Sequence, residues 1–237
     1  RMHQADHRIA RSTRFLEKAM AGYLKARQKR QMLDHLKEKQ EKENLEKKIL
    51  DTYKERHKKV ALHNFYGPKI KIGAIGDTHL GSLYSDLAVL NSLYDIFEKE
   101  GIKHIYHAGD LVDGEKIYRG QEYEIYAHGV DKQIEEVIKN YPKRNNIITW
   151  IIAGNHDLSF YKTSGIDIIE KIAEKRKDIK YLGKIQADIE IEGPMLRLLH
   201  PSGGTAYALS YKPQKIIEAI SGGNKPNIML IGHFHKA

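Results

Sequence analysis

Residues 70–79 read IKIGAIGDTH, residues 104–113 read HIYHAGDLVD and residues 147–157 read IITWIIAGNHD. In each stretch a short run of mostly apolar residues leads to a glycine, and the glycine is followed by Asp or Asn. Apolar runs of this length are typical of buried β-strands, and glycine after them favours a sharp turn. The sequence therefore predicts strands near 70–75, 104–107 and 147–153, each followed by a turn that carries polar side chains.

The same arrangement recurs in the last third of the chain. His200 follows a predicted strand at 195–199, and Gly232, His233 and His235 follow a predicted strand at 228–231. Further strands are predicted at 180–181 and 187–191. Loops at the carboxyl ends of strands are where α/β folds build their sites. We therefore expect these polar side chains to form a site.

Helical stretches separate the strands. Helices are predicted at 86–100, 122–140, 164–177 and 207–220, from their apolar spacing and from the glycine or proline that follows most of them. Strands that alternate with helices favour an α/β architecture. This region is long enough to bury a core of its own.

The beginning of the chain has a different character. Residues 1–63 contain no proline and one glycine, and they are rich in Lys, Glu, Gln, Arg, Leu and Ala, which favour helices. The apolar residues form three short stripes separated by polar stretches, so no sustained coiled-coil heptad is present. We predict a basic helical segment at 1–63 and a separate domain at 64–237.

The positive charge lies almost entirely in that first segment. The whole chain has a formal net charge of +9, with 19 basic and 9 acidic residues in 1–69 but 21 basic and 22 acidic in 70–237. A basic segment of this kind is compatible with nucleic-acid binding, with a solvated helical face, or with assembly through its apolar stripes as a homo-oligomer. Membrane binding is disfavoured because no broad aromatic and leucine face opposes the lysines.

Composition excludes other classes. The chain has no cysteine, which excludes disulfides, thiolate metal sites and a cysteine nucleophile. No apolar run approaches the roughly 18 to 20 residues that cross a bilayer, and the start shows no signal-peptide pattern. We expect a soluble, cytoplasmic protein. Because the sequence begins with Arg, we expect a processed product or a piece of a longer chain.

The polar clusters after the strands resemble a known family. In order, they read DxH at 77–79, GDxxD at 109–113, GNHD at 154–157, a lone His200, and GHxH at 232–235. This ordered series resembles the calcineurin-like metallophosphoesterase superfamily, and it covers nearly all of 70–235. The resemblance implies a two-sheet sandwich flanked by helices, with a two-metal site at one edge.

The resemblance also implies roles for individual residues. It assigns the first metal ion to Asp77, His79 and His235, the second to Asn155, His200 and His233, and a bridging position to Asp110. Carboxylate oxygen and imidazole nitrogen suit manganese, iron or zinc, and we expect two divalent ions, with manganese first among these.

His156 is not a metal ligand in this scheme. The resemblance makes it the residue that protonates the leaving oxygen or stabilises charge in the transition state, and Asp157 is expected to orient His156. Asp113 remains open between a supporting role and a loop cap. The histidines that match no motif position are expected to be structural: His104, His107 and His128.

The resemblance predicts the type of reaction but not the substrate, because the superfamily includes phosphomonoesterases, phosphodiesterases, pyrophosphatases and nucleases. Residues 77–81 read DTHLG, which is similar to the opening motif of SbcD-like DNA repair exonucleases. Together with the basic segment, this favours a DNA nuclease. The alternatives are a phosphomonoesterase or small-diester hydrolase whose N-terminal helices mediate assembly, and a non-enzymatic scaffold. Retention of all seven ligand residues argues against the scaffold.

The sequence departs from the family pattern at its end. It stops two residues after His235, whereas family members continue with further strands of the second sheet. We expect either a shortened second sheet or strands that lie outside this sequence.

Overall fold

The computed structural model describes residues 69–204, 207–208 and 210–235, together with nine positions between residues 20 and 44. The chain divides into two compact units, residues 1–55 and 56–237. The nine described positions of the first unit are helical and exposed. The rest of the segment predicted to be helical at 1–63 lies outside the described residues, and the predicted boundary at 63/64 stays a prediction.

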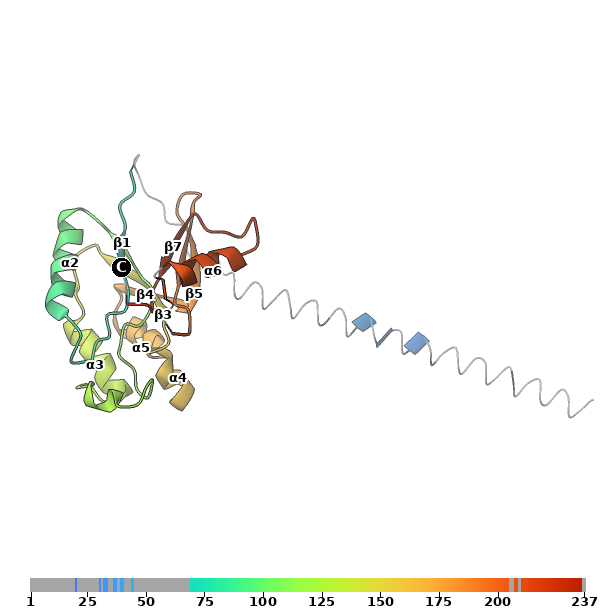
Figure 1. Cartoon of the computed structure of the whole chain (residues 1–237), viewed down its shortest axis with the longest axis horizontal. Coiled ribbons are helices and arrows are strands. Elements are labelled where there is room, and N and C mark those ends of the chain that lie inside the picture. Colours follow the sequence, from blue (N-terminus) through green and yellow to red (C-terminus); the bar gives the residue numbers. More distant parts are fainter. Residues whose placement is uncertain are drawn as a thin grey trace, which may run out of the picture. The chain divides into compact units, whose positions relative to one another are not determined.

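The described part of the second unit alternates strands and helices (Figure 1). Its strands are β1 (Gly73–Ile75), β2 (His104–His107), β3 (Ile148–Ala153), β4 (Ile179–Lys184), β5 (Gln186–Glu190), β6 (Met195–Leu199) and β7 (Ile228–Ile231). Its helices are α2 (Leu87–Lys99), α3 (Val130–Asn140), α4 (Leu158–Ser164), α5 (Ile168–Lys175) and α6 (Tyr211–Ala219), with a 3₁₀ turn at Gln121–Tyr123. In the part of the chain that the structure describes, no helix has the length and apolar character needed to span a bilayer.

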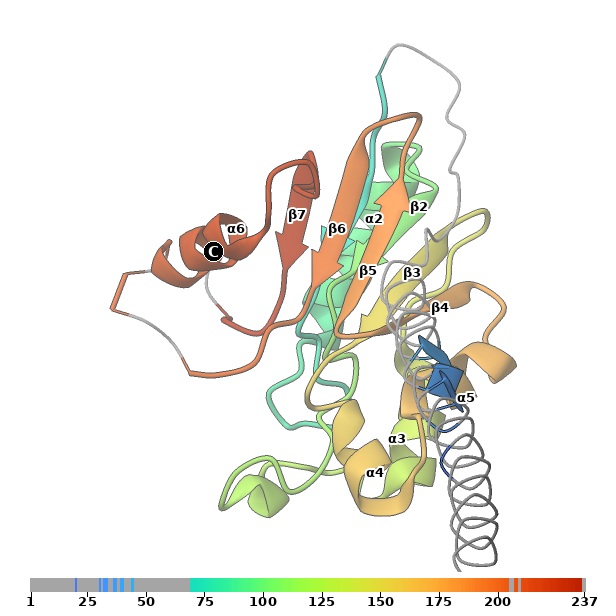
Figure 2. The ribbon, with the colours of Figure 1, turned by 90° about the vertical axis from the view of Figure 1, so that its right-hand side faces the viewer.

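The described strands form two sheets, as the α/β prediction requires. The first has the order β1-β2-β3-β4 with parallel pairing throughout, and the second has the order β5-β6-β7, in which β5 and β6 are antiparallel and β6 and β7 parallel. Figure 2 shows the second sheet in front of the first, with α2 on the far side. The predicted two-sheet sandwich flanked by helices is confirmed.

Alternation along the central strands creates two apolar cores. Ile105 of β2 and Ile151 of β3 point into a core that they share with α2, α3 and α5, whereas Tyr106 and Ile152 point into a core shared with β5 and β6. Both faces of the first sheet are therefore buried, which explains why its strands read as continuous apolar runs.

Two predicted helices differ from the structure. The helix predicted at 122–140 begins only at Val130, because Gly129 adopts a φ of +90° and interrupts the helical pattern. The stretch predicted as one helix at 164–177 contains the end of α4 and the whole of α5, separated by Gly165 at a φ of +74°. Gly165 is in the left-handed conformation that ends a helix, whereas Gly129 is the N-cap residue that precedes the first turn of α3.

Arg176 fixes the end of α3 against the first sheet. The residue is 6% exposed, and its guanidinium donates to the backbone oxygens of Val137, Tyr141 and Pro142 at 3.1, 3.1 and 3.2 Å. It also donates to both carboxylate oxygens of Asp178, at 2.8 and 2.6 Å. Burial opposes ionisation of Asp178, but the Arg176 guanidinium outweighs it and lowers the pKa of Asp178.

Arg176→Lys is expected to lower the free energy of unfolding by about 2 to 4 kcal/mol, because one ammonium group cannot satisfy three carbonyls and a carboxylate together. Urea unfolding measures this. Arg144→Lys is the matched control: Arg144 pairs at 2.7 Å with Asp95, whose side chain is 67% exposed, so a change within about 1 kcal/mol is expected. Equal stability of the two variants would contradict the role given to Arg176.

Candidate metal centre

The structure brings the seven predicted ligands to one edge of the two sheets. Each ligand lies in the turn after a strand. These turns meet because parallel strands present their carboxyl ends at the same edge. Asp77 and His79 follow β1, Asp110 follows β2, Asn155 follows β3, His200 follows β6, and His233 and His235 follow β7. Three neighbouring groups of metal-competent side chains result: Asp77, His79 and His235; His79, Asp113 and His156; and Asp110, His200 and His233.

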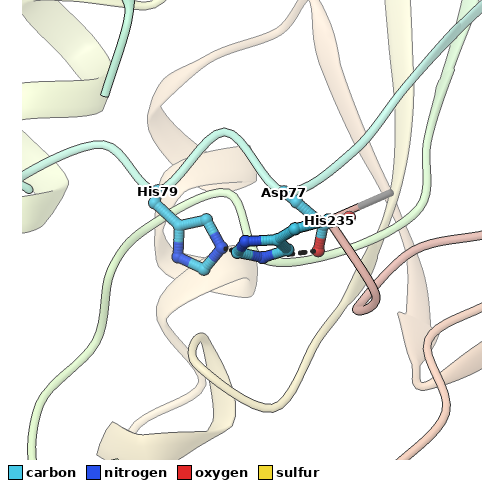
Figure 3. A group of neighbouring side chains, drawn as sticks. All are labelled: Asp77, His79 and His235. Carbon is cyan, nitrogen blue, oxygen red and sulfur yellow. Dashed lines mark hydrogen bonds and ion pairs between the residues drawn. The ribbon is translucent and has the colours of Figure 1, made fainter. Parts of the chain in front are cut away.

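The first group joins the turn after β1 to the end of the described chain (Figure 3). The Nε2 atoms of His79 and His235 lie 3.0 Å apart, and Asp77 Oδ1 lies 3.7 Å from His235 Nε2. The backbone N–H of His233 donates to both oxygens of Asp77, at 2.8 and 3.0 Å. The carboxylate of Asp77 is therefore held in place beside the two rings.

The group of Asp110, His200 and His233 lies next to Asn155 and is more tightly clustered. His200 Nε2 lies 3.1 Å from Asp110 Oδ2 and 3.0 Å from Asn155 Oδ1, and His233 Nδ1 lies 2.9 Å from the same Asn155 oxygen. Two atoms that bind one ion at about 2.1 Å each lie roughly 3.0 to 3.4 Å apart. The spacing of these nitrogen and oxygen atoms therefore fits ligands of a shared ion.

The far side of the His200 ring shows which nitrogen faces the centre. His200 Nδ1 lies 2.8 Å from the backbone oxygen of Ala108, and because a carbonyl only accepts, Nδ1 carries the proton. In the neutral ring, Nε2 then presents a lone pair to the carboxylate of Asp110. Only a cation, either a proton or a metal ion, makes this contact favourable.

The opposite charges of the buried carboxylates and imidazoles also shift the pKa values of His200, His79 and Asp110. Burial opposes protonation of His200, but the negative charge of Asp110 outweighs it and raises the pKa of His200. Burial likewise opposes protonation of His79, whereas Asp113 and Asp110 raise its pKa overall. Burial opposes ionisation of Asp110, and the imidazoles around it, His200 first, lower its pKa. The buried carboxylates thus favour positive charge at the centre.

Asp113 is a supporting residue that the sequence left open. Its Oδ1 lies 3.2 Å from His79 Nδ1, outside hydrogen-bond geometry, so His79 Nδ1 is a buried nitrogen without a hydrogen-bond partner among the described atoms. The side-chain amide of Gln121 donates to the backbone oxygen and to Oδ2 of Asp113, at 2.9 and 3.0 Å. Gln121 thus holds the Asp113 carboxylate beside the back of the His79 ring, the position that carboxylates occupy behind metal-bound imidazoles.

The hydrogen bonds of Asp157 correct the expectation that Asp157 orients His156. The Asp157 oxygens accept the backbone N–H groups of Val112 and Gly154 at 3.0 and 2.8 Å, whereas His156 Nδ1 lies 2.6 Å from the backbone oxygen of Asp113. Asp157 therefore holds the turns after β2 and β3 together. Burial, with a contribution from the charge of Asp110, raises the pKa of Asp157 to about 7.

His107 has a structural role, as expected for a histidine outside the motifs. Its ring is fully buried; Nδ1 accepts the backbone N–H of Gly109 at 3.2 Å, and Nε2 lies 3.0 Å from Thr78 Oγ1. Burial lowers the pKa of His107 to about 3, so the ring is neutral. Its contact with Thr78 positions the turn that carries Asp77 and His79. His104 accepts the indole N–H of Trp150 at 2.9 Å, and His128 is exposed.

Sequence reasoning missed Gln121 and Gln133. The Gln133 side chain accepts the backbone N–H of Gly114 at 2.9 Å and donates to the oxygen of the same residue at 3.0 Å. Both glutamines are buried and hold the loop after Asp113. Neither lies in a motif, so no local signal in the sequence marked them.

Backbone strain is concentrated at the candidate ligands. Five of the seven have positive φ: Asp77 at 53°, His79 at 44°, Asp110 at 54°, His233 at 83° and His235 at 48°. Positive φ is uncommon outside glycine, and such strain gathers where function requires a particular geometry. The turns therefore aim the side chains inward at a cost in local conformational energy.

Comparison with known proteins agrees with this geometry. A family model described as calcineurin-like phosphoesterase matches residues 70–237. The chain is also 41% identical over 59 residues to a protein named DNA polymerase II small subunit from Methanothermobacter thermautotrophicus. That similarity covers 24% of this chain and 12% of the relative.

The close approach of two turns depends on the missing side chain of Gly154. A Cβ atom there would overlap the carboxylate of Asp110. Gly154→Ala is therefore expected to displace Asp110 and to weaken the binding of a divalent metal ion about tenfold or more, measured by isothermal titration calorimetry with manganese as the probe. Gly222→Ala is the control, because a Cβ at Gly222 meets no atom within 4 Å. Equal manganese affinity in the two folded variants would show that this close approach is not required.

Proposed function

Because the chain belongs to the calcineurin-like phosphoesterase family, we propose that its metal centre hydrolyses phosphodiester bonds in DNA. The observation that carries the proposal is the convergence of the seven candidate ligands, Asp110 among them, at one edge of the two sheets. The coarser activity, metal-dependent phosphoester hydrolysis, is that of the family. The phosphodiester bond, the DNA substrate and the use of two ions are the proposal.

The residues divide into ligands and a proton donor. Asp77, His79 and His235 would hold one ion and Asn155, His200 and His233 the other, with Asp110 shared between them. Two ions bound in this way, manganese in our proposal, would lower the pKa of a water between them and stabilise charge on the attacking and leaving oxygens. The carboxylates and amide oxygen of this set match the preference of manganese for oxygen ligands alongside imidazole.

In this proposal, His156 gives a proton to the leaving oxygen. Its Nδ1 donates to the Asp113 backbone oxygen at 2.6 Å, which leaves Nε2 for the substrate. Nε2 has a proton to give only when the ring is an imidazolium, and burial, which lowers the pKa of His156, makes that imidazolium a stronger acid. Its backbone N–H donates to Asp110 Oδ1 at 2.9 Å, so the proton donor is tied to the shared ligand. Positioned acid catalysis of this kind contributes about 10²- to 10⁴-fold to rate.

Two observations support DNA as the substrate. The 19 basic residues of 1–69 can neutralise phosphates without reading sequence. The relative with 41% identity over 59 residues is named as a subunit of a DNA polymerase. The chain spans 12% of that relative's length, so what the whole relative does enters here only as support for a proposal.

A second candidate is a small-ester hydrolase whose N-terminal helices mediate assembly as a homo-oligomer. It is favoured by the exposure of apolar side chains in that segment: Met32 is 68%, Leu33 49% and Leu36 50% exposed within one chain. Residues 70–237, with 21 basic and 22 acidic residues, also give no electrostatic attraction for a polyanion. Manganese-dependent turnover of small esters without strand cleavage would favour this candidate.

His156→Ala is expected to keep manganese binding near that of the parent chain and to lower cleavage of a single-stranded oligonucleotide by about 10²- to 10⁴-fold. Gel analysis of cleavage and metal analysis of the purified variant measure the two effects. His128→Ala is the control, because His128 is an exposed histidine that belongs to none of the motifs. If the parent chain cleaves no DNA, RNA or small phosphodiester in manganese, the proposed function is wrong. Loss of metal from His156→Ala would make His156 a ligand.

Replacing Lys37, Lys39 and Lys42 together by Gln in the full chain tests the basic segment. The plot of log affinity for duplex DNA against log salt is expected to become shallower by roughly 0.9 for each phosphate that the variant no longer neutralises. Fluorescence anisotropy at several salt concentrations measures the slope.

The matched control carries the same change of charge in the second unit. Lys99, Lys180 and Lys225 are exposed there, and their joint replacement by Gln is expected to leave the slope unchanged. If both triple variants change the slope equally, the basic segment has no special part in DNA binding.

A further inference from the structure

A cavity opens directly beside the first group of ligands. Its volume is about 660 Å³, within the range of small-molecule sites, and Asp77, His79, His156 and His235 form one part of its wall. Side chains of α2, among them Leu90, form another part. A substrate whose phosphoryl group reaches the ligands therefore has room for its organic part in this cavity.

The charge of the wall shows which part of a substrate belongs there. Carboxylates of Asp77, Asp86 and Asp113 line the cavity, and the described lining contains no Lys or Arg. A phosphoryl group finds compensating positive charge only where ions bind, at the candidate ligands. The remainder of the cavity suits an uncharged group.

Two tyrosines add aromatic rings to the lining of the cavity. Tyr84 is 77% and Tyr118 47% exposed, and both belong to the lining. The Tyr118 ring lies 6.5 Å from the His156 ring between centroids, and its hydroxyl donates to Glu124. Tyr118 is thus held next to the proton donor with its ring partly open to solvent.

The wall also presents polar oxygens, which have partners in the protein but keep further accepting capacity: Ser85 Oγ donates to the backbone oxygen of Ser82, and Asp86 Oδ1 accepts the backbone N–H of Val89. Ser82, Ser85 and Asp86 line the cavity together with the apolar side chains of α2. A flat heteroaromatic ring satisfies both kinds of surface, because its faces stack on aromatic or apolar side chains and its edges form hydrogen bonds. An alkyl chain would leave these oxygens facing apolar atoms.

We propose that this cavity is a nucleobase subsite, in which the base of a nucleoside phosphoester lies against Tyr118 and Tyr84 while its phosphoryl group lies at the metal ligands. The inference rests on the proposed function and narrows its substrate class to esters that carry a nucleoside. It also locates base recognition in the second unit, independently of the basic segment.

The first test measures binding, with no turnover required. The full chain in manganese is titrated calorimetrically with adenosine 5′-monophosphate and with ribose 5-phosphate, which share the sugar phosphate and differ in the base. Stacking on one aromatic ring strengthens binding by roughly 5- to 150-fold, so adenosine 5′-monophosphate is expected to bind tighter by a factor in this range. Equal affinity for the two ligands would overturn the proposal.

Variants at Tyr118 then assign the difference to one ring. Tyr118→Leu is expected to lower the affinity ratio of the two ligands at least about fivefold, whereas Tyr118→Phe keeps the ring and the ratio. Tyr123→Leu is the matched control, because Tyr123 belongs to the same loop, is 81% exposed and does not line the cavity. A loss that is equal for both ligands would make Tyr118 a structural support and overturn the proposal.

A second arm distinguishes the source of the base. A single-stranded adenylate oligonucleotide replaces the mononucleotide, and the effect of Tyr118→Leu is measured again. Dependence on Tyr118 with both ligands supports a polynucleotide substrate, and dependence with the mononucleotide alone supports a free nucleotide. Dependence with neither would overturn the subsite.

Turnover separates this inference from the proposed function. The parent chain is assayed with thymidine 5′-(4-nitrophenyl phosphate) and with methyl 4-nitrophenyl phosphate, which share a leaving group. If the parent chain hydrolyses neither ester and no DNA oligonucleotide, the proposed function is rejected, while the binding difference still tests the subsite. Hydrolysis of both with equal kcat/KM would retain a phosphodiesterase and reject the nucleobase subsite.

Discussion

The carboxylate of Asp110 is the contact on which the arrangement of the site depends. Its Oδ1 accepts the backbone N–H of His156, its Oδ2 lies 3.1 Å from His200, and its backbone oxygen accepts the N–H of His79 at 3.1 Å. Asp110, in the turn after β2, therefore connects the turns after β1, β3 and β6. The connection is possible only because Gly154 has no side chain at the point where the carboxylate passes. The contacts that position the candidate metal ligands are consequently the same contacts that pack the strand ends together.

That constraint is maintained against considerable strain. A non-glycine residue in a sparsely populated backbone region costs on the order of 1 to 3 kcal/mol, and five candidate ligands have positive φ. The sum is comparable to the whole stability of a typical domain, about 5 to 15 kcal/mol, even if Asp and His take the lower value. Backbone hydrogen bonds between the turns offset it, such as those from Asp77 to Gly109 at 2.9 Å and from Leu80 to Leu111 at 2.8 Å. The site is thus rigid because neighbouring strands impose its geometry.

The sequence predicted those parts of the molecule that follow from local pattern and parallel topology. The bounds predicted for β2, β6 and β7 match the structure, because each is an apolar run closed by a turn. The convergence of the ligands follows from parallel strands. What the sequence did not reveal depends on side-chain contacts that no motif specifies: the bonds of Gln121 to the Asp113 loop, and the two backbone N–H groups that bind Asp157, one of them from distant Val112. A local pattern cannot identify a partner that is 45 residues away, as Val112 is from Asp157.

The uneven charge of the chain distinguishes the two proposed kinds of ligand recognition, that of phosphates by the basic segment and that of an uncharged group by the cavity. Attraction between the basic segment and phosphates is screened over about 8 Å at physiological salt, so it weakens as salt rises. Contacts inside the cavity beside His79 are different, because its lining combines apolar side chains with carboxylates and carries no Lys or Arg among the described residues. Burial of an uncharged group there depends little on salt. Under the two proposals, affinity at low salt would be governed by the number of phosphates that a ligand carries, whereas selectivity at high salt would be governed by the group attached to the phosphoryl at the metal ligands.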